Sequence, residues 1–383
     1  MALMASIADG NKRTASLTDR AFFEHLLRHG SSSRSATASA IGISRPTATE
    51  AVNRLLERQL IREAGTVSTN RGPAAIGYEI NPDAGHSCAL SIEAEQMRLS
   101  CWSLSGHNLF NLVEPLQPNT PQDQPDTTTD EQEDSAEPAS PAASRRESIH
   151  ALLEVYRETV TTPCLGAAVS LTERTQATDE LHALFPGDIP ILVDHNVNWA
   201  AIAEQHHGQA AGIDDALLVH VGHRVDVALI LNGHLHRGSS GMAGELGFTR
   251  NTGQTLMQRL NRLATPQRPD TGLLDPVALK EALCSNSPVA YGLLRILAEA
   301  IANVCVTVDP ALLILTGPLA DALNPRLFDM LLDVLLLPDI EMCCSALGEG
   351  GPHLGAEELA HRAALANLWA GPGEVAEVCK SVL

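Results

Sequence analysis

The segment from Ala36 to Arg71 limits the fold more than any other part of this chain. A short apolar stretch ends near Ala40, Gly42 interrupts it, and Ser44 followed by Pro46 has the pattern of an N-cap and the first turn of a new helix. Apolar residues then recur at helical spacing and form one stripe, namely Ala48, Ala51, Val52, Leu55 and Leu56. Helix, glycine turn and helix predict a helix-turn-helix, whose second helix enters the DNA major groove.

The polar face of the second helix supplies candidate DNA contacts. Short polar side chains at its start can reach base edges, and arginines beside them can reach phosphates. We expect Arg54 to contact phosphate. The predicted DNA-binding residues are Ser44, Arg45, Thr47, Thr49, Asn53, Arg54 and Arg71. The alternative interpretation of this segment is a small helical domain with a solvated basic face.

Two alternating stretches after the second helix predict a wing. Residues 60–63 and 78–80 have the pattern of two strands, joined by a polar loop from Gly65 to Pro73. Arg71 in that loop could place its guanidinium in a narrow minor groove, where the negative potential is strongest. The order of elements is therefore that of a winged helix-turn-helix.

The charge of the chain is divided unevenly. The total is −20, yet residues 11–75 hold ten Lys and Arg against five Asp and Glu, a net of +5. The remainder therefore carries −25. A basic head on an acidic body lets the head approach phosphates while the body is repelled from the duplex and from membranes.

Composition indicates a globular chain of two or three domains. Its 383 residues are 44% hydrophobic without a run of 18 apolar residues, and the N-terminus has no signal-peptide pattern. We expect a cytoplasmic protein that is nucleoid-associated through DNA binding. Eight cysteines are scattered without a CxxC pair, which favours reduced, buried thiols over disulfides or a zinc knuckle.

A turn-rich stretch near residues 81–86 marks a domain boundary. We assign residues 1–85 to the DNA-binding domain and 86–383 to a second domain, interrupted by an insertion at 114–146. The insertion is rich in Pro, Thr, Gln, Ser and acids, so it is expected to be disordered. The second domain alternates apolar strands with helices, which indicates α/β architecture. The predicted strands include residues 164–171, 190–194, 216–221, 225–231 and 311–315, and the predicted helices 147–161, 198–206, 298–308, 327–336 and 357–369.

Two regions of the chain resemble a known family. Leu26-Leu27-Arg28-His29-Gly30, the Ser44-Arg45-Pro46-Thr47 start of the second helix, and Asn81-Pro82-Asp83-Ala84-Gly85 resemble the N-terminus of ROK-family transcription regulators. Residues 86–375 resemble the ROK domain itself. The resemblance implies a winged helix-turn-helix followed by a two-lobed actin/hexokinase-like domain.

The resemblance also implies where a ROK sugar kinase would carry its chemistry. The kinase run Asp-Ile-Gly-Gly-Thr, which binds ATP phosphates, corresponds here to Ile92-Glu93-Ala94-Glu95-Gln96, with two carboxylates and no glycine. In the second phosphate hairpin, from Gly222 to Gly233, glycines are replaced by His223, Arg224, Asp226 and Ala228. The general-base aspartate is replaced by Asn196, and an amide cannot accept the sugar proton. We therefore predict no catalytic residues.

A remnant ligand site is the second implication. Gly244-Glu245-Leu246-Gly247 keeps the glutamate that binds sugar hydroxyls in family members. We name His195, Asn196 and Glu245 as candidate effector-binding residues; a surface acid beside a tight turn is the alternative for Glu245. The zinc-binding histidine of the family is replaced by Phe248, and residues 249–254 contain no cysteine. Histidines from 206 to 236 show no closed ligand set, so we expect no metal and no cofactor.

The sequence thus predicts a sequence-specific transcriptional regulator, a repressor, with double-stranded DNA as its partner and a sugar or related small molecule as its candidate effector. A homodimer or homotetramer on an inverted repeat is expected, since one winged domain reads one half-site. Two alternatives stay open: an ATP-dependent sugar kinase, and an effector-independent regulator controlled by a protein partner.

Overall fold

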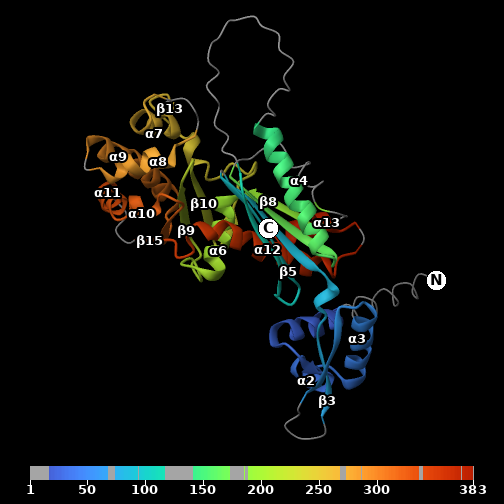
Figure 1. Ribbon diagram of the computed structural model, residues 1–383. Coiled ribbons are helices and arrows are strands. Elements are labelled where there is room, and N and C mark those ends of the chain that lie inside the picture. The colour runs from blue at the N-terminus through green and yellow to red at the C-terminus, as the bar shows by residue number, and fades with distance from the viewer. Residues whose placement is uncertain are drawn as a thin grey trace, which may run out of the picture.

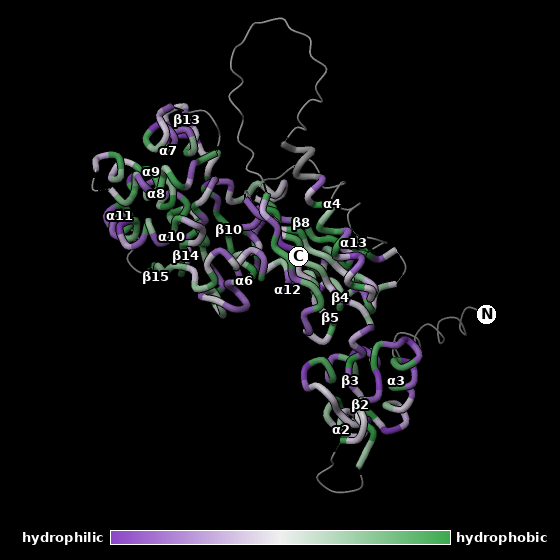
Figure 2. The backbone as a smooth tube through the Cα atoms, in the orientation of Figure 1, coloured by the Kyte–Doolittle hydropathy of each residue, from purple (hydrophilic) through white to green (hydrophobic). Residues whose placement is uncertain are grey.

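The computed structural model describes residues 17–67, 74–93, 95–116, 141–172, 185, 189–267, 273–285, 287–335, 340–371 and 373–382, with side chains left out at 141–146 and 381. These residues form a small head at one end of the molecule and two lobes that lie side by side above it in Figure 1. Figure 2, in which the backbone is coloured by residue hydropathy, shows hydrophobic residues concentrated on the strands and core helices of each part.

The head comprises residues 17–80. Residues 17–29 form its first helix, followed by β1 (Ser32–Ser33), α2 (Arg34–Ala40), α3 (Arg45–Glu57), β2 (Ile61–Val67) and β3 (Ala75–Ile80). Its strands form an antiparallel sheet in the order β1-β3-β2. The predicted apolar stripe of α3 is confirmed, because Ala48, Ala51, Val52 and Leu55 are buried. Helix, turn, helix and hairpin occur in the predicted order.

The hairpin differs from its prediction in length. β2 continues to Val67, so Gly65 lies inside the strand, at a positive φ of 81° next to a β-bulge. A glycine is favoured there because L side chains rarely adopt that conformation. Most of the predicted wing loop, residues 68–73, lies outside the described residues.

The first lobe is built on β4 (His86–Ile92), β5 (Gln96–Ser103), β6 (Asn108–Pro115), β7 (Cys164–Leu171) and β8 (Ile191–His195). The strand order is β6-β5-β4-β7-β8, antiparallel up to β4 and parallel beyond it. Because side chains alternate along a strand, Cys88 and Leu90 face α4 (Pro141–Thr159) while Ala89 faces the opposite layer.

The second lobe repeats this topology. β9 (Ala216–Val221), β10 (Val225–Leu231), β11 (His234–His236), β14 (Leu312–Thr316) and β15 (Glu341–Cys344) form a sheet in the order β11-β10-β9-β14-β15. Again the pairs are antiparallel up to β9 and parallel beyond it. The outer face is covered by α7 (Leu256–Ala264), α8 (Pro276–Cys284), α9 (Pro288–Val308), α10 (Ala320–Leu323) and α11 (Arg326–Val334). A short hairpin, β12 (Arg250–Asn251) and β13 (Gln254–Thr255), precedes α7.

Helix α9 is long and apolar enough to cross a membrane by length and composition alone. Its buried side, which includes Leu293, Leu297 and Ile301, packs into the core of the second lobe. The helix therefore has the burial of a core helix within the described part of the chain.

Two helices lie between the sheets. α6 (Asn196–His207) packs on the second lobe, and α12 (Gly351–Asn367) packs on β4 and β7 of the first lobe (Figure 1). They cross at Gly355, where a Cβ would collide with the backbone of Trp199. Short helical turns at Pro82–Ala84 (η1), Leu246–Phe248 (η2) and Gly348–Gly350 (η3) and the C-terminal helix α13 (Val375–Val382) complete the fold.

The bounds of the predicted insertion need correction. Glu114 and Pro115 pair with β5 as part of β6, and residues 141–146 already belong to α4. The sequence concealed this because its polar and proline-rich composition continues across both element ends. The rest of the insertion, residues 117–140, lies outside the described residues.

Candidate DNA interface and candidate effector site

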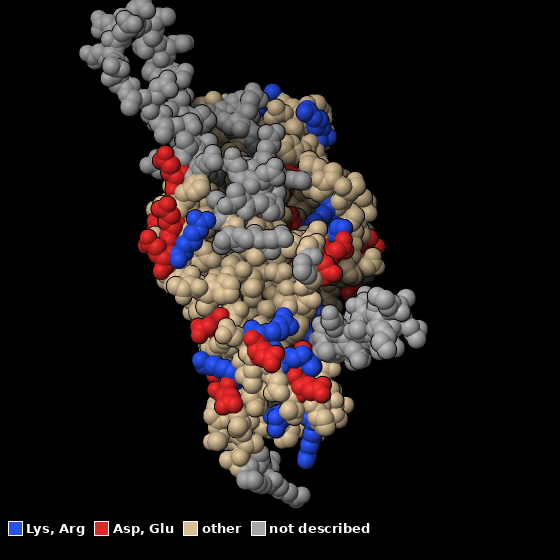
Figure 3. All heavy atoms as spheres, turned by 90° about the vertical axis from the view of Figure 1, so that its right-hand side faces the viewer, with Lys and Arg blue, Asp and Glu red and all other residues tan. Residues whose placement is uncertain are grey.

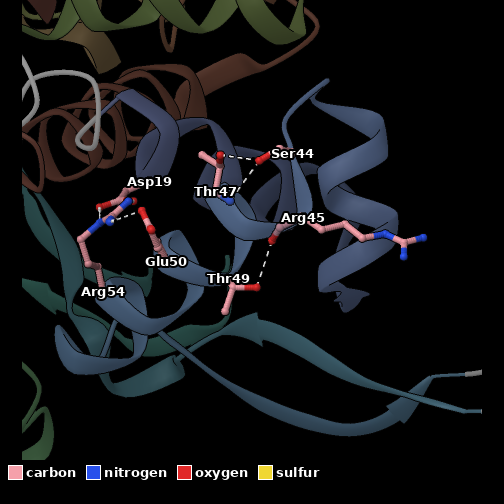
Figure 4. A network of polar contacts seen from close by, with 7 residues as sticks. All are labelled: Asp19, Ser44, Arg45, Thr47, Thr49, Glu50 and Arg54. Carbon is pink, nitrogen blue, oxygen red and sulfur yellow. Dashed lines mark hydrogen bonds and ion pairs between the residues drawn. The ribbon is translucent and has the colours of Figure 1, made fainter.

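The start of α3 is locally well defined. Ser44 is the N-cap: its Oγ accepts from the backbone N–H of Thr47 at 3.2 Å and lies 2.7 Å from the Thr47 hydroxyl. Pro46 fits the first turn, where its missing N–H breaks no helical hydrogen bond. Figure 4 shows this capped end with Ser44 and Thr47 side by side. The predicted helix start is confirmed, and it is exposed to solvent.

Arg45 is the most outward of the predicted residues. It is exposed, and Figure 4 shows its guanidinium pointing away from the other labelled side chains. Thr49 is half-buried, and its hydroxyl donates to the backbone O of Arg45 at 3.0 Å, whereas Asn53 is exposed one turn further along. The exposed side of α3 therefore presents Arg45 and Asn53 beside the half-buried Thr49, and it also exposes the carboxylate of Glu50.

The expectation that Arg54 contacts phosphate stays a prediction, and the structure gives this side chain partners within the head. Its Nη2 donates to Asp19 Oδ1 at 2.7 Å and its Nε donates to Asp19 Oδ2 at 3.0 Å, with Glu50 at 3.8 Å (Figure 4). The carboxylate of Asp19 is 4% exposed and comes from the first helix. Arg54 is thus engaged in joining two helices of the head, and the hydrogen bond to Asp19 raises its pKa.

Two further arginines bear on DNA binding by the head, Arg71 and Arg34. Arg71 lies outside the described residues, so its predicted place in the wing stays a prediction. Arg34, the first residue of α2, is exposed and was not singled out from the sequence. In the face seen in Figure 3, the basic side chains of the head are interspersed with acidic ones.

The head is fastened to the end of α12. Arg58, the C-cap of α3, donates from Nη2 to the backbone O of Leu368 at 2.7 Å, and its guanidinium carbon lies 5.0 Å from the ring centroid of Trp369. Phe23 meets the same ring edge to face, with 5.7 Å between centroids. One continuous apolar cluster joins the head to Leu104 and Ala364 of the first lobe and α12. The sequence contained no local signal for this contact.

Helix α12 is in turn pinned to the first lobe by a buried polar group. His353 lies between Ser91 (Nδ1 to Oγ 2.7 Å) and Ser100 (Nε2 to Oγ 2.8 Å). Glu357, one turn later, accepts from Ser100 and from Trp102 Nε1 at 2.8 Å. Burial raises the pKa of Glu357, but the hydrogen bonds from His353, Ser100 and Trp102 together lower it to about 2.

Two pairs of polar side chains bridge the lobes. Arg237, directly after β11, donates from Nε to Asp194 Oδ2 at 2.6 Å, and Asp194 also accepts from Asn198 Nδ2 at 2.7 Å. His195, next to Asp194 at the end of β8, has its Nδ1 3.6 Å from Glu245 Oε1. The structure therefore brings together two of the three candidate effector residues, one from each lobe.

Asn196, the third candidate, is buried at the start of α6, and its Oδ1 accepts from the neighbouring Val197 N–H at 2.8 Å. It adjoins the His195–Glu245 pair in sequence, but the structure gives it no hydrogen bond to Glu245. Sequence reasoning missed Asp194 and Arg237, the other bridging pair; the acid beside His195 was visible, whereas its partner lies 43 residues away.

Arg224 occupies the centre of the second-lobe side of this site. Its Nη2 donates to Glu245 Oε2 at 3.0 Å, its Nε lies 3.5 Å from Asp226 Oδ2, and its guanidinium carbon lies 4.8 Å from the Phe248 ring centroid. Burial, with a smaller contribution from Glu245, raises the pKa of Asp226 to about 6 even though Arg224 opposes the change. Arg224 therefore contacts both acids, and Glu245 also contacts His195.

The turn between β9 and β10 is also occupied by side chains with internal partners. His223 contacts the backbone O of Leu274 through Nδ1 at 3.2 Å, while its own carbonyl accepts from the Leu274 N–H at 2.8 Å. Arg224 from the same turn reaches Glu245. This is the turn where the resemblance placed a glycine-lined phosphate site, and here it is filled by an imidazole and a guanidinium.

Comparison with known proteins agrees with this fold. A model of the ROK family matches residues 177–261. The chain is 21% identical over 240 residues to the xylose repressor of Bacillus subtilis (strain 168), a match covering 60% of this chain and 59% of that one. The chain thus spans about three fifths of the length of the curated relatives it matches.

Solved structures give the same result for the fold. A ROK family transcriptional regulator, described as a homolog of the E. coli MLC protein, aligns with 96% of this chain and 99% of its own at a TM-score of 0.60 and 15% identity. A ROK hexokinase from Thermus thermophilus aligns with 71% of this chain and 97% of its own, at a TM-score of 0.50 and 18% identity. The fold is that of ROK regulators and sugar kinases. Residues 177–261 match the ROK family model, in agreement with the resemblance.

Proposed function

We propose that this protein is a sequence-specific transcriptional repressor whose head, within residues 1–85, binds operator DNA through α3. The observation that carries the proposal is the capped and exposed start of α3, with Arg45 directed outward, on a head fastened to a ROK-type body. Ser44, Thr47, Thr49 and Asn53 would contact base edges, with Arg71 in the wing. Arg54 is left out of the contact set, because Asp19 already engages it. The repressor assignment is supported by the xylose repressors among the relatives, and such a protein works in the cytoplasm.

The working unit of this proposal is a homodimer on an inverted repeat. A single head covers one half-site, and two heads related by two-fold symmetry read a palindrome. Large apolar side chains are exposed on the outer helices of the second lobe, including Tyr291 and Val306 on α9 and Leu332 on α11. A second copy burying that surface would leave both heads free; a homotetramer would pair two such dimers.

The candidate effector is a sugar or a related polyol bound between the lobes. The hydroxyl groups of the sugar would bind these side chains in place of the His195–Glu245 and Asp194–Arg237 contacts, because a hydroxyl can both donate and accept a hydrogen bond. Asn196 adds an amide at the same place. Because α12 is fixed to the first lobe and ends on the head, a change in lobe separation would move the heads relative to each other.

Three residues of this site, Asn196, Arg224 and His223, oppose the kinase alternative. By the family resemblance, Asn196 stands where a kinase needs its general base, and Arg224 and His223 lie in the turn where phosphate would bind, held by Glu245 and the backbone of Leu274. The fold likeness to a ROK hexokinase keeps a direct assay necessary. Incubation of the pure protein with ATP and a panel of hexoses and pentoses should give no ADP above a blank, whereas sugar-dependent ADP formation would restore the kinase assignment.

The proposed function is tested by selecting genomic fragments with the purified full-length protein. We expect enrichment of a recurring inverted repeat upstream of a gene, and release of that fragment by one member of a sugar panel. The same sugar should raise the melting temperature. Enrichment without any sugar response would favour the regulator controlled by a protein partner, and no enrichment would contradict DNA recognition altogether.

A further inference from the structure

Three cysteines and a histidine meet on one face of the first-lobe sheet, at its end nearest the head. His86 and Cys88 lie two positions apart on β4, so their side chains share a face of the sheet. In the register of the sheet, Cys164 on β7 pairs with His86, and Cys101 on β5 pairs with Cys88. Strand pairing alone therefore gathers residues that are far apart in the chain.

The distances are those of a ligand set. One ligand atom from each of His86, Cys88 and Cys164 lies within 4.8 Å of the others. The Sγ atoms of Cys88 and Cys164 are 3.9 Å apart. Four sulfurs about 2.3 Å from a tetrahedral zinc ion would be about 3.8 Å from one another, so this pair needs little adjustment. Cys101 Sγ lies 2.9 Å from Cys88 Sγ, which is shorter than the separation of two sulfurs on one zinc ion, and Cys101 does not belong to the group whose ligand atoms lie within 4.8 Å of one another.

The imidazole is held by neighbours on both nitrogens. His86 Nδ1 lies 2.9 Å from Thr162 Oγ1, and Nε2 lies 2.8 Å from the Tyr156 hydroxyl. Metal-bound histidines commonly have their second nitrogen fixed by an outer partner in this way. Thr162 can keep that role while Nε2 exchanges the Tyr156 hydroxyl for a cation.

We propose that His86, Cys88 and Cys164 bind one thiol-preferring divalent cation of the Zn²⁺ class. The site differs from the zinc site that the family resemblance implied near Phe248, and it revises our expectation from sequence that the chain has no metal site. Three protein ligands leave one position of a tetrahedral ion for a water molecule, and the ion would hold together the two neighbouring strands, β4 and β7, that supply them.

The binding step is an exchange of cation for protons. Zn²⁺ displaces the thiol protons of Cys88 and Cys164, which pass to solvent, and no electron is transferred. Cys164 is only half-buried, so the cluster has a route from solvent.

The site lies at the junction between the head and the first lobe, so a bound cation would affect how the head is held. His86 directly follows Gly85 and the η1 turn (Pro82–Ala84), and its N–H donates to the carbonyl of Pro163 at 3.0 Å. A cation bound by His86 and Cys164 would tie the strand that leaves the head to the segment that enters β7. It would stiffen the junction without touching DNA or effector.

The test is equilibrium dialysis of the reduced full-length protein against Zn²⁺ alone, followed by metal analysis, and titration with Co²⁺ as a spectroscopic substitute. We expect one metal per chain, a thiolate-to-Co²⁺ charge-transfer band in the near ultraviolet, and its displacement by Zn²⁺. Cys164→Ser should lower the affinity at least 10-fold, whereas Cys284→Ser, at an exposed thiol of α8, should leave it unchanged.

Removal of the metal from the wild-type protein by a chelator keeps the test independent of whether a variant folds. The apo protein should melt at a lower temperature and recover on adding one equivalent of Zn²⁺. Less than about 0.2 metal per chain, a band that survives in Cys164→Ser, or a native Cys88–Cys101 disulfide in the mass spectrum would each overturn the proposal.

Discussion

The guanidinium of Arg58, at the C-terminal end of the candidate recognition helix α3, stacks over the indole of Trp369, just beyond the end of α12. Its Nη2 also donates to the backbone of Leu368. These residues are more than 300 positions apart, and they fix the direction in which the head leaves the body. The position of α3 is therefore coupled to whatever moves α12.

Replacing Trp369 by alanine tests this junction. The ring contacts both Phe23 and Arg58, so Trp369→Ala should lower the free energy of unfolding by about 1–3 kcal/mol, less than for a fully buried ring because the indole is only half-buried. Urea unfolding followed by circular dichroism measures it. Leu17→Ala, at a side chain that is 69% exposed in the same head, is the matched control. Equal stability of both variants would mean that the junction contributes nothing.

Alanine substitution of Arg54 and of Arg45 should have different effects on stability. Arg54→Ala leaves the buried carboxylate of Asp19 without its guanidinium, which should cost about 2–4 kcal/mol of stability. Arg45 is exposed, so Arg45→Ala should change the unfolding free energy by less than about 0.5 kcal/mol. Chemical denaturation of the two variants decides it. A stable Arg54→Ala protein that loses only DNA affinity would return Arg54 to the phosphate contacts.

Glu357 should make the protein acid-sensitive. Its folded pKa of about 2 lies below the ordinary 4.5, so the charged form is stabilised. That contribution is fully present above the unfolded pKa and is lost as pH falls toward about 2. Wild-type protein should therefore lose about 1–3 kcal/mol between pH 5 and pH 2 that Glu357→Gln does not lose. Parallel pH titrations of stability with identical slopes would contradict this.

Arg224 should control a pH dependence of the opposite sign. The folded pKa of Asp226, about 6, exceeds its ordinary 3.8, so the proton binds more tightly to the folded state and stability falls as pH rises through this range. Arg224→Ala removes the cation shared by Asp226 and Glu245. The variant should thus be destabilised more at pH 8 than at pH 5, by about 1–2 kcal/mol. Melting temperatures across pH, with Arg250→Ala at an exposed site as control, provide the comparison. A pH-independent loss would mean that Asp226 does not titrate in this range.

The sequence predicted what depends on local pattern. Caps, the Gly42 turn and helical spacing placed α2 and α3, and apolar runs placed β7, β9 and β10. The sequence predicted element ends less well where the terminal residues are polar, as at the end of β6 and the start of α4. The pairs that decide the chemistry depend on strand register and on docking of distant helices. Asp19–Arg54, Asp194–Arg237, Arg58–Trp369 and the His86–Cys164 pairing leave no periodic trace in the chain.

The most direct test of DNA recognition is the affinity of wild-type protein and Arg45→Ala for the selected fragment and for scrambled DNA, across a salt series. We predict a steep fall of wild-type affinity with salt, a preference for the selected fragment, and a loss of about 10- to 100-fold in that preference for Arg45→Ala, which keeps its stability. Equal binding of both proteins to both DNAs at every salt concentration would contradict base readout by α3.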